Sequence, residues 1–275
     1  MNNILSKKLK HVTLFFVLTA TMTWGFYSAI LFMGLRPYEG LGMAFLICGG
    51  MVPSLIGVIM ALATYNKEGK KEFFKRFYQV KRIGAGWWLF ILLIYPAIQA
   101  CAILINQKLG GAMPEMAQMQ VIIQSPVSII PFLFFNLFSG AWPEEFGWRG
   151  FALQPLLDKF GFTKANLILG TIWCFWHLPL FFMPEQSHSQ WWIEWGFVGL
   201  LIYLAQTIGL SMIICFVFVK TKQSILSALM LHMFCNATAN LMFPNSVTYT
   251  MIQFLVVFAV GIILSIYMEV TKTSV

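Results

Sequence analysis

The chain has 275 residues, of which 59% are hydrophobic and only 10% are charged. Soluble domains carry about a quarter charged residues, so this composition excludes a water-soluble globular protein. The net charge of +8 does not indicate nucleic-acid binding, because the basic residues lie between apolar segments, where lipid headgroups and membrane orientation account for them.

Apolar segments long enough to cross a bilayer recur along the whole chain. The first follows Lys7, Lys8 and Lys10, but it is too long for the core of a signal peptide, so we expect it to be retained. The sequence predicts an all-α fold, a single polytopic membrane domain over residues 1–275. The eight expected transmembrane helices lie at roughly residues 12–35, 41–64, 87–106, 126–148, 165–183, 193–219, 224–243 and 248–268.

The basic residues alternate between the two sides of this eight-span arrangement. Of the 18 Lys and Arg residues, only Arg36 and Lys108 fall on the side opposite the termini. Because loops rich in Lys and Arg stay in the cytoplasm, both termini are predicted to be cytoplasmic. The largest basic loop, residues 66–82, interleaves basic and aromatic residues. We interpret it as an amphipathic helix on anionic lipid, with a docking surface for a partner or substrate as the alternative.

The fourth expected span contains two adjacent carboxylates, Glu144 and Glu145, in the sequence SGAWPEEFGWRGF. Ionisable groups at this depth are costly in a bilayer and normally face a bundle interior or a water-filled cavity. Arg149 follows Glu145 by one helical turn, so these two can pair, and Glu144 is left without that partner. Pro143 is expected to kink the span just before the carboxylates. The alternative interpretation is an ion pair that only fixes helix packing.

Two later spans also carry polar groups in apolar surroundings. His177 lies well inside the fifth expected span, in TIWCFWHLPLFF, with Trp173 one turn before it on the same face. In the seventh span, His232, Asn236 and Asn240 recur every four residues and form one polar stripe. Each feature alone indicates hydrogen bonding between helices. Together, a carboxylate, an imidazole and oxyanion donors are the groups needed to hydrolyse an amide bond.

In order and spacing, these motifs resemble the three signature motifs of the CPBP family. That family comprises the CAAX endopeptidases, which trim prenylated proteins, and bacterial relatives that include bacteriocin-processing and self-immunity proteins. The resemblance covers roughly residues 126–243. The second family motif usually begins with Phe, so Trp173 is a mild departure. The matching motifs are Glu144-Glu145-x-x-x-Arg149, Trp173-x-x-x-His177 and His232-x-x-x-Asn236.

The resemblance implies an eight-helix membrane fold with a catalytic core at residues 126–243 and a cavity that opens to the cytoplasm. It implies that Glu144 is the general base that activates water, assisted by His177, and that His232 and Asn236 stabilise the oxyanion. The full expected site has Glu144, Glu145, His177, His232 and Asn236 as catalytic residues, with Arg149, Trp173 and Asn240 in supporting roles.

Metal dependence stays open at this point. The family is commonly labelled metalloprotease, and Glu144, His177 and His232 are the candidate zinc ligands, but one Glu and two His also suffice for water activation without a metal.

We therefore expect an intramembrane endopeptidase that cleaves a lipidated or membrane-associated peptide or protein. The expected partners are that substrate and membrane lipid, without nucleic acid, and the expected location is a bacterial plasma membrane. One alternative is a non-catalytic immunity or regulatory scaffold of the same fold. Another is a proton-coupled transporter that uses the carboxylates and histidines as a relay. The sequence gives no expectation for the oligomeric state.

Overall fold

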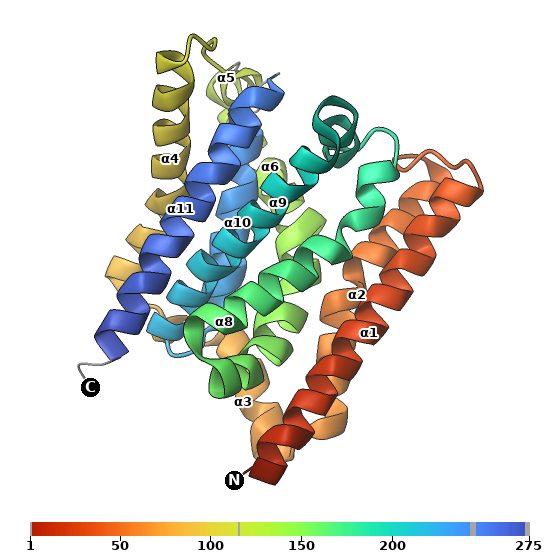
Figure 1. Ribbon diagram of the computed structural model, residues 1–275, viewed down its shortest axis with the longest axis vertical. Coiled ribbons are helices and arrows are strands. Elements are labelled where there is room, and N and C mark those ends of the chain that lie inside the picture. Colours follow the sequence, from red (N-terminus) through yellow and green to blue (C-terminus); the bar gives the residue numbers. More distant parts are fainter. Residues whose placement is uncertain (1, 115, 243–245, 273–275) are drawn as a thin grey trace.

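The structure, a computed structural model, describes residues 2–114, 116–242 and 246–272, and its regular structure within these ranges is entirely helical. The end of the expected seventh span, residue 243, lies outside the described residues. The long helices pack side by side as one bundle (Figure 1). They are α1 (Asn2–Phe32), α2 (Gly40–Thr64), α4 (Ala85–Lys108), α8 (Leu153–Trp176), α9 (Ser187–Lys220), α10 (Ile225–Leu241) and α11 (Val247–Lys272).

Shorter helices connect the long ones and build the fourth expected span. They are α3 (Lys67–Tyr78), η1 (Val80–Arg82), α5 (Ala117–Gln124), η2 (Pro126–Ser128), α6 (Ile129–Asn136), η3 (Leu137–Ala141), α7 (Trp142–Glu145), η4 (Phe146–Ala152) and η5 (Leu178–Phe182).

Six helical stretches in the described part of the chain are long and apolar enough to cross a membrane, which makes this a multi-pass membrane protein. The number is lower than the expected eight for two reasons. One stretch of 57 residues, 126–182, holds two of the expected spans, and α10 falls in the shorter class of apolar helices. The count of eight stays a prediction.

The 57-residue stretch is not straight. Gly161 interrupts α8 with φ 74° and ψ −178°, a conformation that L side chains rarely adopt, and the chain turns back there. In Figure 1, α1 begins and α11 ends at the same end of the bundle, which we call the terminal end. We call the opposite end, with residues 33–39 and 183–186, the loop end.

The basic segment 66–82 forms the expected helix, α3, at the terminal end. Its Phe73 and Arg76 are buried. The Arg76 Nη2 donates to the Gly150 carbonyl over 2.8 Å, and Ser224 Oγ donates to the Arg76 carbonyl over 3.4 Å. Burial lowers the pKa of the Arg76 guanidinium. One face of α3 is therefore docked on the bundle, directly against η4 and the start of α10, while its contact with anionic lipid stays a prediction.

The fourth expected span departs from a regular helix around Pro143. Wide π-helical turns, η3 and η4, stand on both sides of the four-residue α7. Pro143 itself lies in the first turn of α7. Insertions of this kind occur often at functional sites, because they change which side chains face the interior. The irregularity that we expected at Pro143 therefore takes the form of two wide turns.

Glycines allow the closest helix contacts. A Cβ atom on Gly209 in α9 would lie 2.5 Å from Phe258 Cα in α11, and one on Gly261 would lie 2.6 Å from Gly209 Cα. Such distances leave no room for any side chain. This close approach of small residues is typical of packing between membrane helices.

Gly209→Ala is therefore expected to push α9 and α11 apart and to destabilise the protein by about 1–3 kcal/mol, the usual cost of overpacking. Thermal unfolding in detergent measures this effect. Gly25→Ala in α1 is the matched control, because a Cβ there meets nothing within 4 Å. An equal melting temperature for both variants would contradict the packing argument.

Candidate active site

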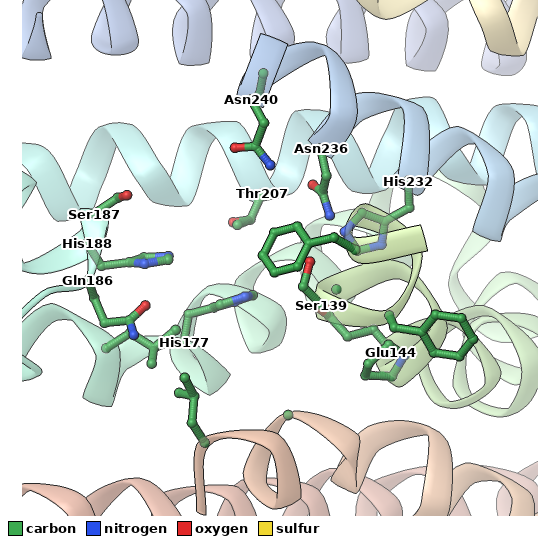
Figure 2. Close-up of a pocket in the computed structure, with 18 of the residues that line it drawn as sticks. Ser139, Glu144, His177, Gln186, Ser187, His188, Thr207, His232, Asn236 and Asn240 are labelled. Atoms are coloured by element: carbon green, nitrogen blue, oxygen red, sulfur yellow. The ribbon is translucent and has the colours of Figure 1, made fainter. Parts of the chain in front are cut away.

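A cavity of about 990 Å³ lies within the bundle and holds most of the polar groups expected from the sequence (Figure 2). It begins at Glu144 and His232 and reaches Tyr38, Gln186 and Ser187 at the loop end. Its walls are largely aromatic and aliphatic. The few polar side chains therefore stand out as the groups able to orient and to react with a bound molecule.

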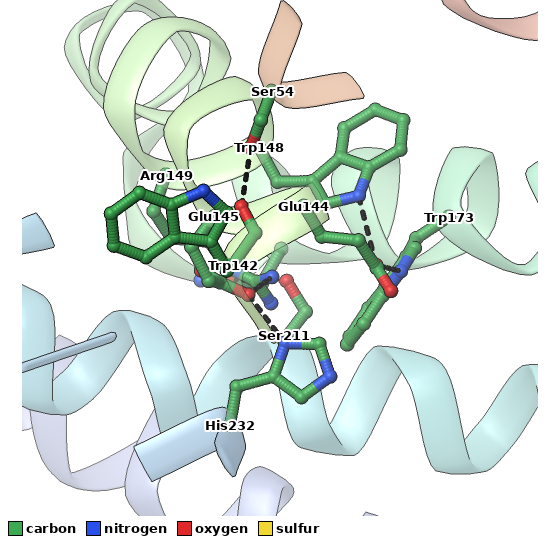
Figure 3. A network of polar contacts seen from close by, with 10 residues as sticks. Ser54, Trp142, Glu144, Glu145, Trp148, Arg149, Trp173, Ser211 and His232 are labelled. Carbon is green, nitrogen blue, oxygen red and sulfur yellow. Dashed lines mark hydrogen bonds and ion pairs between the residues drawn. The ribbon is translucent and has the colours of Figure 1, made fainter. Parts of the chain in front are cut away.

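Glu144 lines this cavity and is 5% exposed. Its Oε2 accepts two indole N–H groups, from Trp173 over 2.6 Å and from Trp148 over 3.2 Å (Figure 3). Hydrogen bonds to a carboxylate are strong in a low-dielectric interior, so these two donors fix the carboxylate and leave Oε1 for another partner. Trp173 thus supplies a hydrogen bond to Glu144 that the usual Phe at this place in the motif has no N–H group to make.

Glu145 faces away from the cavity and is wholly buried. Its Oε1 accepts from Arg149 Nη1 over 2.7 Å and from His232 Nδ1 over 2.8 Å. The expected Glu145–Arg149 pair is therefore confirmed. The Arg149 Cζ atom also lies 4.6 Å from the centre of the Trp173 ring, a cation–π contact. Glu145 and Arg149 together form a charged layer behind the cavity wall.

His177 lies inside the apolar helical stretch 126–182, as expected, but not within one unbroken helix. His177 is the residue that ends α8, after which the chain continues as η5. The physical reason is Pro179, which has no N–H to continue the helix and disfavours helical backbone just before it. The His177 Nδ1 lies 2.8 Å from the Trp173 carbonyl. Because a carbonyl only accepts, Nδ1 carries the proton and Nε2 of the neutral ring is a free acceptor.

The polar stripe on α10 is confirmed, but its three members have different partners. His232 bonds to Glu145, as described above. A Cβ on Gly140 would lie 2.7 Å from Asn236 Nδ2, so the glycine gives the amide its place beside η3. Asn240 Nδ2 donates to Asn136 Oδ1 over 2.7 Å and links α10 to α6. The sequence analysis missed the buried Asn136, because nothing in its apolar surroundings marks it as a partner.

A second polar group in the cavity was also missed by the sequence analysis. The His188 ring stacks on the His177 ring, with centres 5.5 Å apart and 16° between planes. Both ring nitrogens of His188 and the Nε2 of Gln186 are buried and have no hydrogen-bond partner. Figure 2 shows both side chains beside His177, away from Glu144. No spacing in the sequence links their segment to His177.

The expected zinc ligands find no support in the arrangement of the side chains. Within the described ranges, no group of three or more His, Cys, Asp or Glu residues is placed to hold a metal ion. The three residues are therefore not assembled as a metal site in the described part of the chain, and we derive no catalytic step through a metal.

Comparison with known proteins gives two matches. Residues 126–238 match the family described as Type II CAAX prenyl endopeptidase Rce1-like. The CAAX prenyl protease 2 of Methanococcus maripaludis is 28% identical to the chain over 205 residues, which cover 74% of each protein. The matched range contains all three motifs, and the family resemblance expected from them is confirmed.

The Glu145–Arg149 pair allows a test of the charged layer. Arg149→Met leaves a buried carboxylate without its cation, and removal of one partner from a buried pair costs about 3–5 kcal/mol. We expect this loss in thermal or denaturant unfolding in detergent. The double variant Glu145→Gln, Arg149→Met removes both charges and should recover part of the stability. A double variant as unstable as Arg149→Met would contradict the pairing argument.

Proposed function

We propose that the protein is an intramembrane endopeptidase in which Glu144 activates water, on the premise that its residues 126–238 match the Rce1-like family of CAAX prenyl endopeptidases. One observation carries the proposal. The Glu144 carboxylate lines the cavity and is held on one oxygen by two indole donors, while His177, His232 and Asn236 line the same space.

In the first step, Glu144 Oε1 takes a proton from a water molecule, and the resulting hydroxide attacks the carbonyl carbon of the scissile peptide bond. His177 Nε2 is free to accept a hydrogen bond and orients the same water molecule. A carboxylate fixed in advance needs no rearrangement when the reaction begins, which lowers the cost of reaching the transition state.

In the second step, the negative charge on the former carbonyl oxygen is stabilised by donors on α10. Asn236 Nδ2 is one donor. His232 donates a hydrogen bond from Nδ1 to Glu145 Oε1, so its Nε2 donates only when the ring carries a second proton, and Glu145 stabilises that imidazolium. The C–N bond then breaks, and protonated Glu144 returns its proton to the leaving nitrogen. The products are a carboxylic acid and an amine, and transfer of the acid's proton to the amine gives a carboxylate and an ammonium group.

Glu145 and Arg149 act as positioning residues in this proposal, since neither lines the cavity. Glu145 holds the His232 ring, and Arg149 holds Glu145. A shift in this layer would move His232 and so change the oxyanion site. Asn240 has a similar indirect role, because its bond to Asn136 ties α10 to the helix that leads to Glu144.

We further propose eight membrane passages with both termini in the cytoplasm of a bacterium. The turn at Gly161 divides residues 126–182 into two passages, and α10 supplies the shorter eighth one. The substrate is a peptide or lipidated protein at the membrane, since the reactive groups lie inside an apolar bundle. A scaffold that keeps this fold without the chemistry is the alternative outcome of the first test below.

Glu144→Gln is expected to abolish cleavage, because the amide still accepts the indole hydrogen bonds but cannot take a proton from water. The measurement compares peptide N-termini in cells that express either protein at matched levels, with membrane insertion verified. Glu194→Gln is the control, an exposed carboxylate changed in the same way. Identical termini for wild type and Glu144→Gln would support the scaffold alternative.

Trp173→Phe keeps the aromatic ring but removes the shorter hydrogen bond to Glu144. A hydrogen bond to a charged group contributes about 1.5–3 kcal/mol, so a loss of roughly ten- to a hundredfold in cleavage rate is expected. Trp176→Phe is the matched control, because its buried indole donates to Thr23 instead. The hydrogen-bond argument fails if both variants lose the same activity.

A further inference from the structure

The cavity extends from the middle of the bundle to the loop end. On α2 it is lined by residues near the start of the helix, from Met43 to Met51, and on α11 by Thr250, Gln253 and Phe254, also near its start. Tyr38, between α1 and α2, and Gln186, between η5 and α9, also line it. All these segments lie at the loop end, opposite the start of α1 and the end of α11 (Figure 1).

The basic residues gather at the other end. The terminal end carries Lys7, Lys8 and Lys10, all seven basic residues of α3 and η1, and Lys220 with Lys222. In the described part of the loop end, the only Lys or Arg residues are Arg36 and Lys108. Arg36 is moreover paired with Glu39 and Glu185. A bias this strong places the terminal end in the cytoplasm.

Two expectations from the sequence are therefore incompatible, namely cytoplasmic termini and a cavity that opens to the cytoplasm. From the charge distribution together with the position of the cavity, we propose that the cavity opens on the non-cytoplasmic side of the membrane. The substrate class follows from this orientation and rests on the proposed function. The substrate is then the peptide segment of an exported chain that stays anchored to the membrane, and not a prenylated protein in the cytosol.

The chemistry at the loop end suits a peptide that arrives from that side. Gln186 is 9% exposed, lines the cavity and has an unpartnered Nε2, and both nitrogens of His188 are unpartnered as well. One ring nitrogen of a neutral His188 donates and the other accepts, so with Gln186 they match the C=O and N–H groups of a peptide backbone. Among the described residues, no Lys or Arg side chain lines the cavity, so an uncharged backbone fits better than a free carboxylate.

The sidedness is tested by cysteine labelling, which needs no enzymatic activity. The starting protein carries Cys48→Ala and Cys101→Ala, which removes the two exposed cysteines. Ser187→Cys then reports on the cavity, Gln190→Cys on the surface of the loop end, and Lys71→Cys on α3 at the terminal end. A membrane-impermeant maleimide is added to intact cells and, in parallel, to permeabilised cells.

We expect Ser187→Cys and Gln190→Cys to be labelled to the same extent in intact and permeabilised cells, and Lys71→Cys only after permeabilisation. The reverse pattern would overturn the proposal. Equal labelling of the two ends in intact cells would overturn it too, because a fixed orientation could not produce it. The same labelling in a Glu144→Gln background separates sidedness from catalysis, since loss of cleavage would leave the labelling unchanged.

The substrate class is tested with the termini that depend on Glu144. They are expected in segments outside the cytoplasm, near a lipid anchor or the outer end of a transmembrane helix. Termini confined to cytosolic segments would contradict the substrate class even if labelling had placed the cavity outside. Absence of any such terminus, with labelling as expected, would count against the proposed protease function and leave the sidedness intact.

Discussion

The burial of charge in an apolar helix bundle is the constraint on which the rest of this structure depends. Only 10% of the residues are charged, yet Glu145 and Arg149 are wholly inaccessible and Glu144 nearly so. Charges are tolerated in such a place only when partners neutralise them or donate hydrogen bonds to them. Because those partners come from η4, α8 and α10, satisfying the charges also brings the three helices, and the reactive groups on them, to one point.

Two adjacent carboxylates receive opposite environments from this arrangement. Neighbouring residues on a helix point about 100° apart, so one can face a cavity while the next faces the protein interior. Glu145 meets a cation and an imidazole, whereas Glu144 meets two uncharged indole donors and open space. Trp173 belongs to both environments, because its N–H bonds Glu144 and its ring lies against Arg149. It therefore couples the charged layer to the cavity wall.

Basic side chains and the cavity lie toward opposite ends of the bundle. Basic side chains occupy the terminal end, where α3 docks through Arg76 beneath the π-helical turn η4. The cavity extends from the middle of the bundle to the loop end, among aromatic side chains and unpaired polar groups such as those of Gln186 and His188. The proposed reactive centre lies near the middle of the bundle. In our proposal a substrate reaches it from the loop end.

The sequence by itself determined the helical membrane fold, the Glu145–Arg149 pair and the polar stripe on α10, because these follow from hydropathy and from spacing along one helix. Only the tertiary structure decided what lies opposite each group. The indole donors to Glu144, the stacking of His188 on His177 and the end of α8 at His177 join segments whose relative placement no local pattern encodes. The position of the cavity at the loop end is of the same kind, since an empty space is bounded by many helices at once and no single segment specifies it.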